Sequence, residues 1–188
     1  TITWHPFSKG YSTSNLLIGV QPVNIVFNGS ATEKKFIIEI AGSDPSCHLD
    51  LAFFDTGVID IVETTADGST KLTDTSGSGV SWQNFEFIVV VLDGSSVKLE
   101  GDNGTVLATA TWSNAPASIE QIGASGGADA VESGQVIVAI IYDPYAGITE
   151  SMSGIIASMI PLIITVIGIG LVLGVAKYIL KMVKDIIG

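Results

Sequence analysis

Cys47 and His48 stand side by side in the sequence, and a thiol beside an imidazole is a pairing that nucleophilic catalysis uses. The segment "HLDLAFF", which starts at His48, alternates polar and apolar residues and therefore predicts a strand. Neighbouring residues of a strand point to opposite faces, so these two side chains would not form a hydrogen-bonded pair. The second histidine, His5, is distant in sequence, and the set cannot supply the four nitrogen and sulfur ligands of a structural zinc site. We therefore expect no catalytic residues and a non-enzymatic protein, with Cys47 acting as a small buried hydrophobe.

Two short motifs offer weaker site chemistry. "EGDNGT" brings Glu100, Asp102 and Asn103 onto one tight turn, and oxygen ligands of this kind suit Ca²⁺; the alternative is a solvated acidic hairpin. No other metal or cofactor is expected. "NGS" at Asn28 and "NGT" at Asn103 are acceptor sequons for glycosylation, but Asn-Gly is also the preferred two-residue hairpin turn.

An apolar run near the end of the chain predicts a membrane span. Residues 151–176 are 26 consecutive residues without a charge, and as a helix they would extend about 39 Å, longer than the roughly 30 Å of a bilayer core. Small residues recur along it, and such stripes let transmembrane helices approach closely. The predicted packing residues are Gly154, Ser158, Pro161, Thr165 and Gly168 on one face, and Gly170 and Gly174 on the opposite face.

Three lysines follow the apolar run. Lys177, Lys181 and Lys184 share one face of a helix, which predicts contact with anionic lipid headgroups at the membrane surface. The alternative is contact with an enclosed polyanion such as a packaged genome. Because lysines flank spans on the cytoplasmic side, we expect a single-pass protein with its N-terminal domain outside and its C-terminus inside a cell or virion. Export of that domain would require a leader that has already been removed.

Charge is divided sharply along the chain. Residues 1–150 hold five lysines against 18 acids, a formal net charge of −13, whereas residues 151–188 hold three lysines and one acid, a net charge of +2. An acidic domain repels phosphate groups, so we expect no nucleic acid binding through it. The single cysteine excludes an intrachain disulfide, so the outer domain must be held by its own core.

The N-terminal part has the pattern of an all-β protein. Short runs rich in Val, Ile, Phe and Thr are separated by Gly, Ser, Asp and Asn clusters. Alternation within several runs predicts two sheets packed face to face, as a β-sandwich or jelly roll. We assign residues 1–145 to this ectodomain and residues 146–188 to a linker, one long transmembrane α-helix and a basic amphipathic end. The predicted strands cover residues 16–20, 23–27, 35–41, 48–54, 58–64, 85–92, 97–100, 105–112, 118–123 and 135–142.

About 60 residues resemble the C-terminal half of a laminin G-like, concanavalin-type jelly roll. The matching positions are Asp93, Gly94, Ser95, Val97 and Leu99 in one hairpin, Asn103–Gly104 in the next turn, Ile122–Gly123 in a later strand, and Tyr142–Asp143 at the end. The chain departs from that family at Glu100, where an aromatic residue is usual. The resemblance implies the jelly-roll fold, and no binding site is carried over from it.

Together these features predict a membrane-anchored structural protein of a surface assembly. An acidic outer module on a small-residue helix with a basic inner end broadly resembles coat and membrane-anchored structural proteins of virions, whether capsid or envelope. Its expected partners are the lipid membrane, copies of itself and other coat or membrane subunits. The alternative is a cell-surface adhesin or lectin-like binding module that recognises a glycan or a cell-surface receptor.

Overall fold

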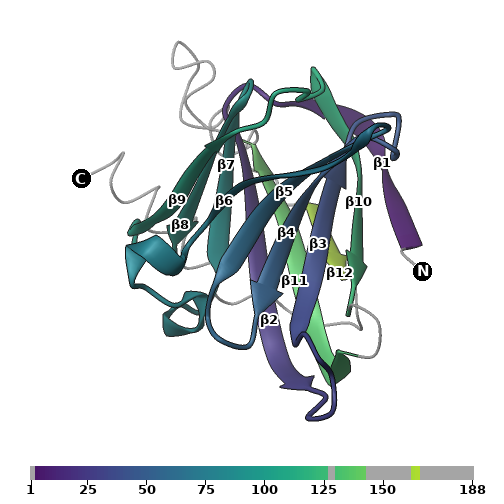
Figure 1. The fold of residues 1–188 in the computed structure, drawn as a ribbon. Coiled ribbons are helices and arrows are strands. Elements are labelled where there is room, and N and C mark those ends of the chain that lie inside the picture. The colour runs from purple at the N-terminus through teal and green to yellow at the C-terminus, as the bar shows by residue number, and fades with distance from the viewer. Residues whose placement is uncertain (1–2, 127–129, 143–161, 166–188) are drawn as a thin grey trace.

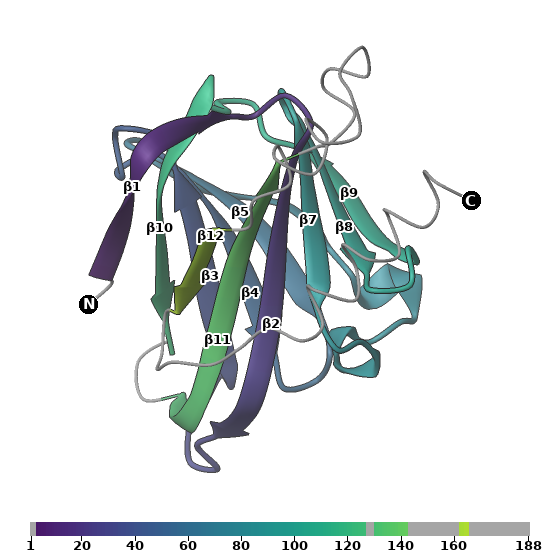
Figure 2. The same cartoon turned by 180° about the vertical axis from the view of Figure 1, so that it is seen from behind.

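The computed structural model describes residues 3–126, 130–142 and 162–165, and these form two antiparallel sheets packed face to face (Figure 1). Sheet A has six strands in the order β1-β10-β3-β4-β5-β6, and sheet B has six in the order β12-β11-β2-β7-β8-β9. Figure 2 shows the molecule from behind, with sheet B in front and its long strands β2 and β11 side by side. The predicted all-β sandwich is therefore confirmed.

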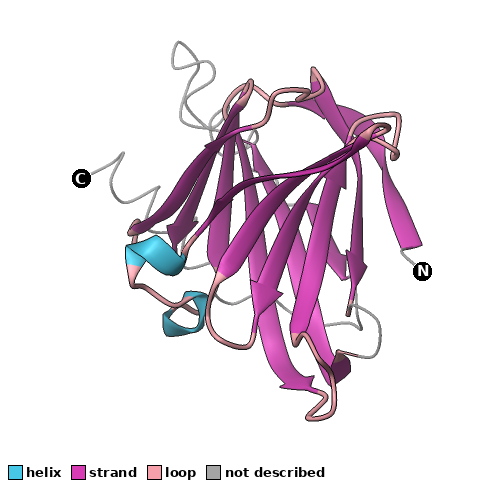
Figure 3. Cartoon of the chain, in the orientation of Figure 1, coloured by secondary structure: helices cyan, strands magenta, loops and turns pink. Residues whose placement is uncertain are grey.

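Strands β1, β2 and β11 are longer than the others, and two 3₁₀ turns lie between β6 and β7 (Figure 3). Sheet A consists of β1 (Thr3–Ser12), β3 (Lys35–Ala41), β4 (His48–Phe54), β5 (Ile59–Thr65), β6 (Gly68–Asp74) and β10 (Ser118–Ser125). Sheet B consists of β2 (Leu16–Phe27), β7 (Ile88–Asp93), β8 (Ser96–Gly101), β9 (Val106–Thr111), β11 (Val131–Tyr142) and β12 (Leu162–Thr165). The 3₁₀ turns are η1 (Ser76–Ser78) and η2 (Trp82–Asn84).

The core lies between the sheets and follows the alternation of the sequence. Leu49, Leu51 and Phe53 of β4 are fully buried, whereas His48 and Asp50 face outward, as predicted. Antiparallel pairing places outward residues of neighbouring strands beside one another, so one face of sheet A is a continuous outer surface. The predicted hairpin at Asp93 is also confirmed, because Asp93 pairs with Ser96 across a two-residue turn. Gly94 occupies this turn with a φ of 60°, a conformation that glycine adopts without steric cost.

The predicted transmembrane helix is wrong at the four residues of its range that the structure describes. Leu162–Thr165 forms strand β12, in which Leu162 pairs with Ile140 and Thr165 with Ile137 of β11. The reason is local: three of these four residues are β-branched, and the free edge of β11 offers a partner strand. Among the described residues there is no helix that is long and apolar enough to cross a membrane.

Most of the predicted C-terminal features lie outside the described residues. These are the small-residue positions Gly154, Ser158, Pro161, Gly168, Gly170 and Gly174, and the basic positions Lys177, Lys181 and Lys184. Helix packing and headgroup contact through these residues stay predictions.

Candidate binding face on sheet A

Two adjacent rows of side chains cross the outer face of sheet A, and we call them together the polar face. The register of the six strands defines them, because directly opposed residues of antiparallel strands point to the same side. From β1 to β6, one row is Trp4, Gly123, Glu39, Asp50, Val62 and Lys71. The other row is Pro6, Gln121, Ala41, His48, Thr64 and Ser69.

Three ionisable side chains meet at the centre of the polar face. His48 Nε2 lies 3.1 Å from Asp50 Oδ1 and 4.0 Å from Glu39 Oε2. One potential ligand atom from each of the three side chains lies within 4.8 Å of the other two. The Glu39 side chain is only 4% exposed, while His48 and Asp50 are 15% and 18% exposed. The cluster is therefore a sunken site that solvent reaches through His48 and Asp50.

The orientation of His48 is fixed by its backbone surroundings. Its Nδ1 lies 2.8 Å from the carbonyl oxygen of Pro45, which can only accept, so Nδ1 carries a proton. Nε2 then faces the two carboxylates. Asp50 is held in turn by Thr64, whose Oγ1 donates to Asp50 Oδ2 over 3.0 Å. The loop before β4 thus holds His48, and strand β5 holds Asp50.

The electrostatics of the cluster favour bound protons. Burial raises the pKa of Glu39 to about 7, and the negative charge of Asp50 adds to that rise while His48 opposes it. The pKa of His48 is also raised, first by its interaction with the Asp50 carboxylate, although its partial burial works in the opposite direction. Glu39 and Asp50 are directly opposed on neighbouring strands, where like charges repel.

These shifts predict that the protein loses stability as pH rises. A carboxyl group whose pKa rises from 4.5 to about 7 on folding stabilises the folded state below pH 4.5, and that contribution is lost progressively up to about pH 7. His48 acts with the same sign, since its raised pKa favours the folded state at low pH. In the wild type the free energy of unfolding should fall between pH 4.5 and 8. We expect Glu39→Gln to make that fall smaller by about 1–3 kcal/mol.

The measurement is urea unfolding between pH 4.5 and 8 in the presence of a chelator. Glu33→Gln is the matched control, because that carboxylate is exposed and pairs with Lys35 at 2.6 Å. Its slope of stability against pH should follow that of the wild type over this range. Equal slopes for the wild type and Glu39→Gln would show that Glu39 is not the titrating group.

An aromatic side chain covers one side of the cluster. The ring of Trp4 meets that of His48 edge-on, with centroids 5.7 Å apart and planes at 67°. Trp4 belongs to edge strand β1 and His48 to β4, so the ring reaches across β10 and β3. The residue opposite Trp4 on β10 is Gly123, which has no side chain to block this path. Trp4 therefore places a large, half-buried apolar surface beside the ionisable groups.

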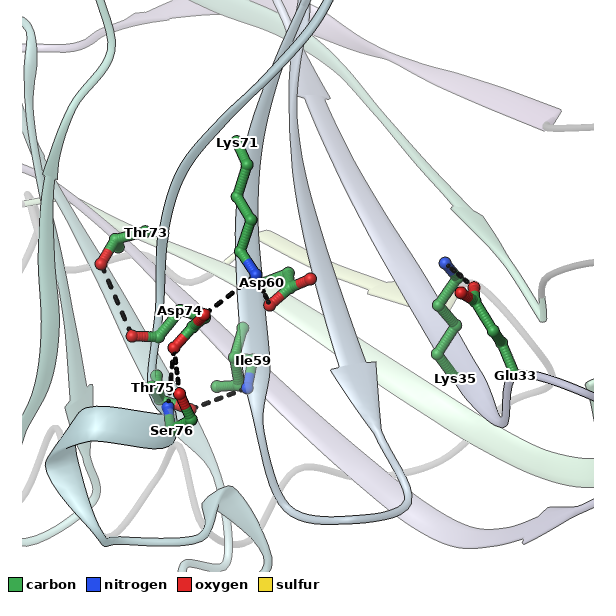
Figure 4. A network of polar contacts seen from close by, with 9 residues as sticks. All are labelled: Glu33, Lys35, Ile59, Asp60, Lys71, Thr73, Asp74, Thr75 and Ser76. Carbon is green, nitrogen blue, oxygen red and sulfur yellow. Dashed lines mark hydrogen bonds and ion pairs between the residues drawn. The ribbon is translucent and has the colours of Figure 1, made fainter.

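A second polar network lies at the edge of the polar face formed by β5 and β6 (Figure 4). Lys71 Nζ lies 3.1 Å from Asp60 Oδ1 and 2.9 Å from Asp74 Oδ2. Hydrogen bonds from the hydroxyl and backbone of Ser76, together with Lys71, lower the pKa of Asp74 to about 2. Thr75 Oγ1 also accepts from the backbone N–H of Ile59 over 2.8 Å. The network joins β5, β6 and η1, and it keeps the charges of this edge paired.

A groove of about 400 Å³ lies at the opposite end, where β1 leaves regular pairing with β10 between Pro6 and Tyr11. Gln121 is held there because its Nε2 donates to the carbonyl oxygen of Gly42 over 2.7 Å. The groove is lined by Pro6, Phe7, Ser8, Lys9, Gly10, Ser43, Glu120 and Gln121. Its lining includes Pro6 and Gln121 of the row that contains His48, so it continues the polar face.

The candidate calcium ligands and the two glycosylation sequons that the sequence singled out lie away from this face. The Glu100 carboxylate is 2.7 Å from Lys98 Nζ, and Asp102 Oδ2 accepts from the backbone N–H of Glu86. In the described ranges, neither acid belongs to a cluster of three His, Cys, Asp or Glu side chains, so a calcium site there gains no support. The side chains of Asn28 and Asn103 accept from Ser30 N and Thr105 N within their own turns.

Cys47 is half-buried in the loop before β4, so the expected burial as a core residue is wrong. His48 turns its ring toward Pro45 and Asp50, and Cys47 Sγ lies 4.0 Å from Ser46 Oγ. Sequence reasoning missed Glu39 and Trp4 as site residues. The alternation of β4 identifies the outward pair His48 and Asp50, but only the strand register brings Glu39 and Trp4 beside them.

Comparisons with known proteins add fold information only. No family model matches the chain, and no curated protein matches it. Among solved structures, galectin-Ib of Xenopus laevis superposes with a TM-score of 0.50 at 12% identity, covering 72% of this chain and 99% of that one. Chicken galectin 2 gives 0.46 at 16% identity with the same coverage, and an ancestral congerin gives 0.48 at 14% identity, covering 71% and 98%. The residues that the structure describes therefore form a galectin-like β-sandwich of two antiparallel sheets.

Proposed function

We propose that this chain is a carbohydrate-binding protein that holds glycan on the polar face of sheet A. This is the lectin-like alternative of the sequence analysis. The supporting observation is the convergence of Glu39, His48, Asp50 and Thr64 beside the Trp4 ring. A binding site of this kind combines a few placed polar groups with apolar or aromatic surface.

The side chains match the chemistry of a sugar. Sugar hydroxyl groups donate and accept, and carboxylates form the stronger, charge-assisted hydrogen bonds. Glu39 Oε2 is buried and accepts no hydrogen bond within the described part of the chain, so a donor from a ligand would satisfy it. The C–H surface of a sugar ring would pack on Trp4, whose indole combines an apolar body with an N–H donor.

The fold alone does not distinguish this proposal from the structural one. Jelly rolls and related sandwiches occur both in viral capsid domains and in lectin domains. The function must therefore be inferred from the side chains of the site. A coat protein that uses sheet A only for packing would not need a sunken cluster of ionisable groups. Membrane anchoring, lateral packing through the C-terminal segment and an outside position for the N-terminal domain remain part of the proposal, as does a role without catalysis.

A glycan array probed with the intact chain in mild detergent tests the proposal, followed by titration of the best-bound glycan. We expect Trp4→Ala to weaken binding about tenfold or more, which corresponds to about 1.4 kcal/mol of lost stacking. Lys98→Ala is the control, because Lys98 is on β8 of the opposite sheet and should leave affinity within about twofold.

Two outcomes would contradict the proposal. The array could show no specific binding by a folded protein, or Trp4→Ala could bind the selected glycan as tightly as the wild type. Ordered lateral arrays of the intact chain without glycan binding would favour the structural alternative.

A further inference from the structure

We propose that Glu39, His48 and Asp50 bind a divalent transition-metal ion such as Zn²⁺ on the outer face of sheet A. The inference concerns the same face as the proposed glycan site, but it does not depend on glycan binding. It rests on four features of the cluster: the donor set, the orientation of its ligands, the buried carboxylate and the access from solvent.

The donor set fits the ion. Zn²⁺ takes imidazole nitrogen and carboxylate oxygen at about 2.0–2.2 Å, and it prefers four ligands in a tetrahedron, so neighbouring donor atoms lie roughly 3.5 Å apart. The observed separations of His48 Nε2 from Asp50 Oδ1 and Glu39 Oε2, 3.1 and 4.0 Å, bracket that value. Small side-chain rotations would suffice. Calcium fits poorly, since it prefers six to eight oxygen ligands.

The ligands are already oriented by outer partners. Metal-binding histidines usually donate their second ring N–H to a carbonyl or carboxylate, and His48 Nδ1 does so toward the Pro45 carbonyl at 2.8 Å. That contact directs the Nε2 lone pair at the carboxylates. The hydroxyl of Thr64 binds Asp50 Oδ2 and leaves Oδ1 directed at the imidazole.

The carboxylate of Glu39 is an independent observation that favours a cation at this position. The side chain is 4% exposed, and its Oε2 has no hydrogen-bond partner among the residues that the structure describes. The directly opposed residue on β4 is another acid, Asp50. Burying a carboxylate oxygen that accepts no hydrogen bond is costly, and placing a like charge opposite it adds to the cost. A divalent cation between the two carboxylates would offset both effects.

Three protein ligands would leave one position of a tetrahedral ion for a fourth ligand. Three protein ligands plus one open position is the arrangement of zinc sites that bind water or a further ligand. His48 and Asp50 keep 15% and 18% of their side-chain surface exposed, so the open position would face solvent beside Trp4. A water molecule, or a ligand oxygen bound to the polar face, would complete the shell.

Calorimetric titration of Zn²⁺ into the intact chain, stripped of metal in detergent, tests the site. We expect about one equivalent of Zn²⁺ to bind and to raise the melting temperature. Glu39→Gln and His48→Ala should each weaken Zn²⁺ binding at least about 100-fold, because each removes a ligand. Thr64→Val should weaken it about tenfold, because Thr64 only orients Asp50. Cobalt substitution supplies a separate signature, because a His-carboxylate site gives visible d–d absorption that Glu39→Gln should abolish.

The controls separate this site from others. His5→Ala removes the only other histidine of the chain, and Cys47→Ser removes the only thiol; both should bind Zn²⁺ as the wild type does. Unchanged binding in Glu39→Gln, or binding lost in Cys47→Ser, would overturn the proposal, as would no binding at all. If His48→Ala does not fold, the near-isosteric Glu39→Gln decides. Trp4→Ala should lose glycan and keep Zn²⁺, so failure of one proposal is distinguishable from failure of the other.

Discussion

Replacing Phe53 with alanine is expected to lower the free energy of unfolding by about 3–5 kcal/mol. Phe53 is fully buried in the centre of the sandwich. Its ring stacks on Phe36 with centroids 4.7 Å apart and meets Trp82 edge-on at 5.7 Å. Alanine would leave a cavity that rigid strands on both sides cannot fill.

Phe54→Ala is the matched control for this substitution. Phe54 is the next residue of β4, faces outward and is half-buried, with Lys35 Nζ 5.2 Å from its ring centre. Its loss should cost no more than about 1.5 kcal/mol. Urea unfolding of the two variants gives the comparison. Equal losses of stability would mean that the assigned inward and outward faces of β4 are wrong.

Replacing Glu63 with alanine is expected to cost about 2–4 kcal/mol, the second largest effect. This carboxylate is 4% exposed at the end of β5 and accepts three hydrogen bonds from the segment after β9. The donors are Asn114 N and Asn114 Nδ2, both at 2.7 Å, and Ser113 N at 3.3 Å. Without the carboxylate, part-buried donors lose their acceptor, and a link between sheet A and the β9–β10 connection is lost.

Asn114→Ala isolates one of these bonds. It removes the side-chain donor and leaves the two backbone donors bound to Glu63, so a loss of about 1 kcal/mol is expected. Thermal and urea unfolding of both variants give the difference. If Glu63→Ala were no more destabilised than Asn114→Ala, the two backbone hydrogen bonds to Glu63 would contribute nothing measurable to stability.

How far sequence reasoning succeeds can be seen strand by strand. β3 and β4 have their predicted bounds because each is a dense apolar run with clear alternation and turn residues at both ends. β2 runs through residues 21–22, where the sequence predicts a gap between two strands, and pairs along its length with β11. β1 and β6 were not predicted, since both are edge strands with largely exposed, polar residues that give no apolar period.

The candidate site shows the same limit. Alternation along β4 placed His48 and Asp50 on the wet face from the sequence alone. Glu39 could not be assigned to them, because "KFIIEIA" has apolar residues on both sides of the strand and its partners depend on register. Trp4 lies on an unpredicted strand, and its contact with His48 needs the order β1-β10-β3-β4, which no local pattern contains.

The most direct test of glycan binding on sheet A uses the three tryptophans of the chain as reporters. Trp4 lies on the polar face, whereas Trp82 and Trp112 are buried in the core. Indole N–H resonances, assigned with Trp4→Phe, would be followed during titration with the glycan selected on the array. We predict that the Trp4 signal moves in a saturable way while the other two stay in place. A saturating glycan that leaves the Trp4 signal unmoved would contradict the assignment of sheet A as the binding face.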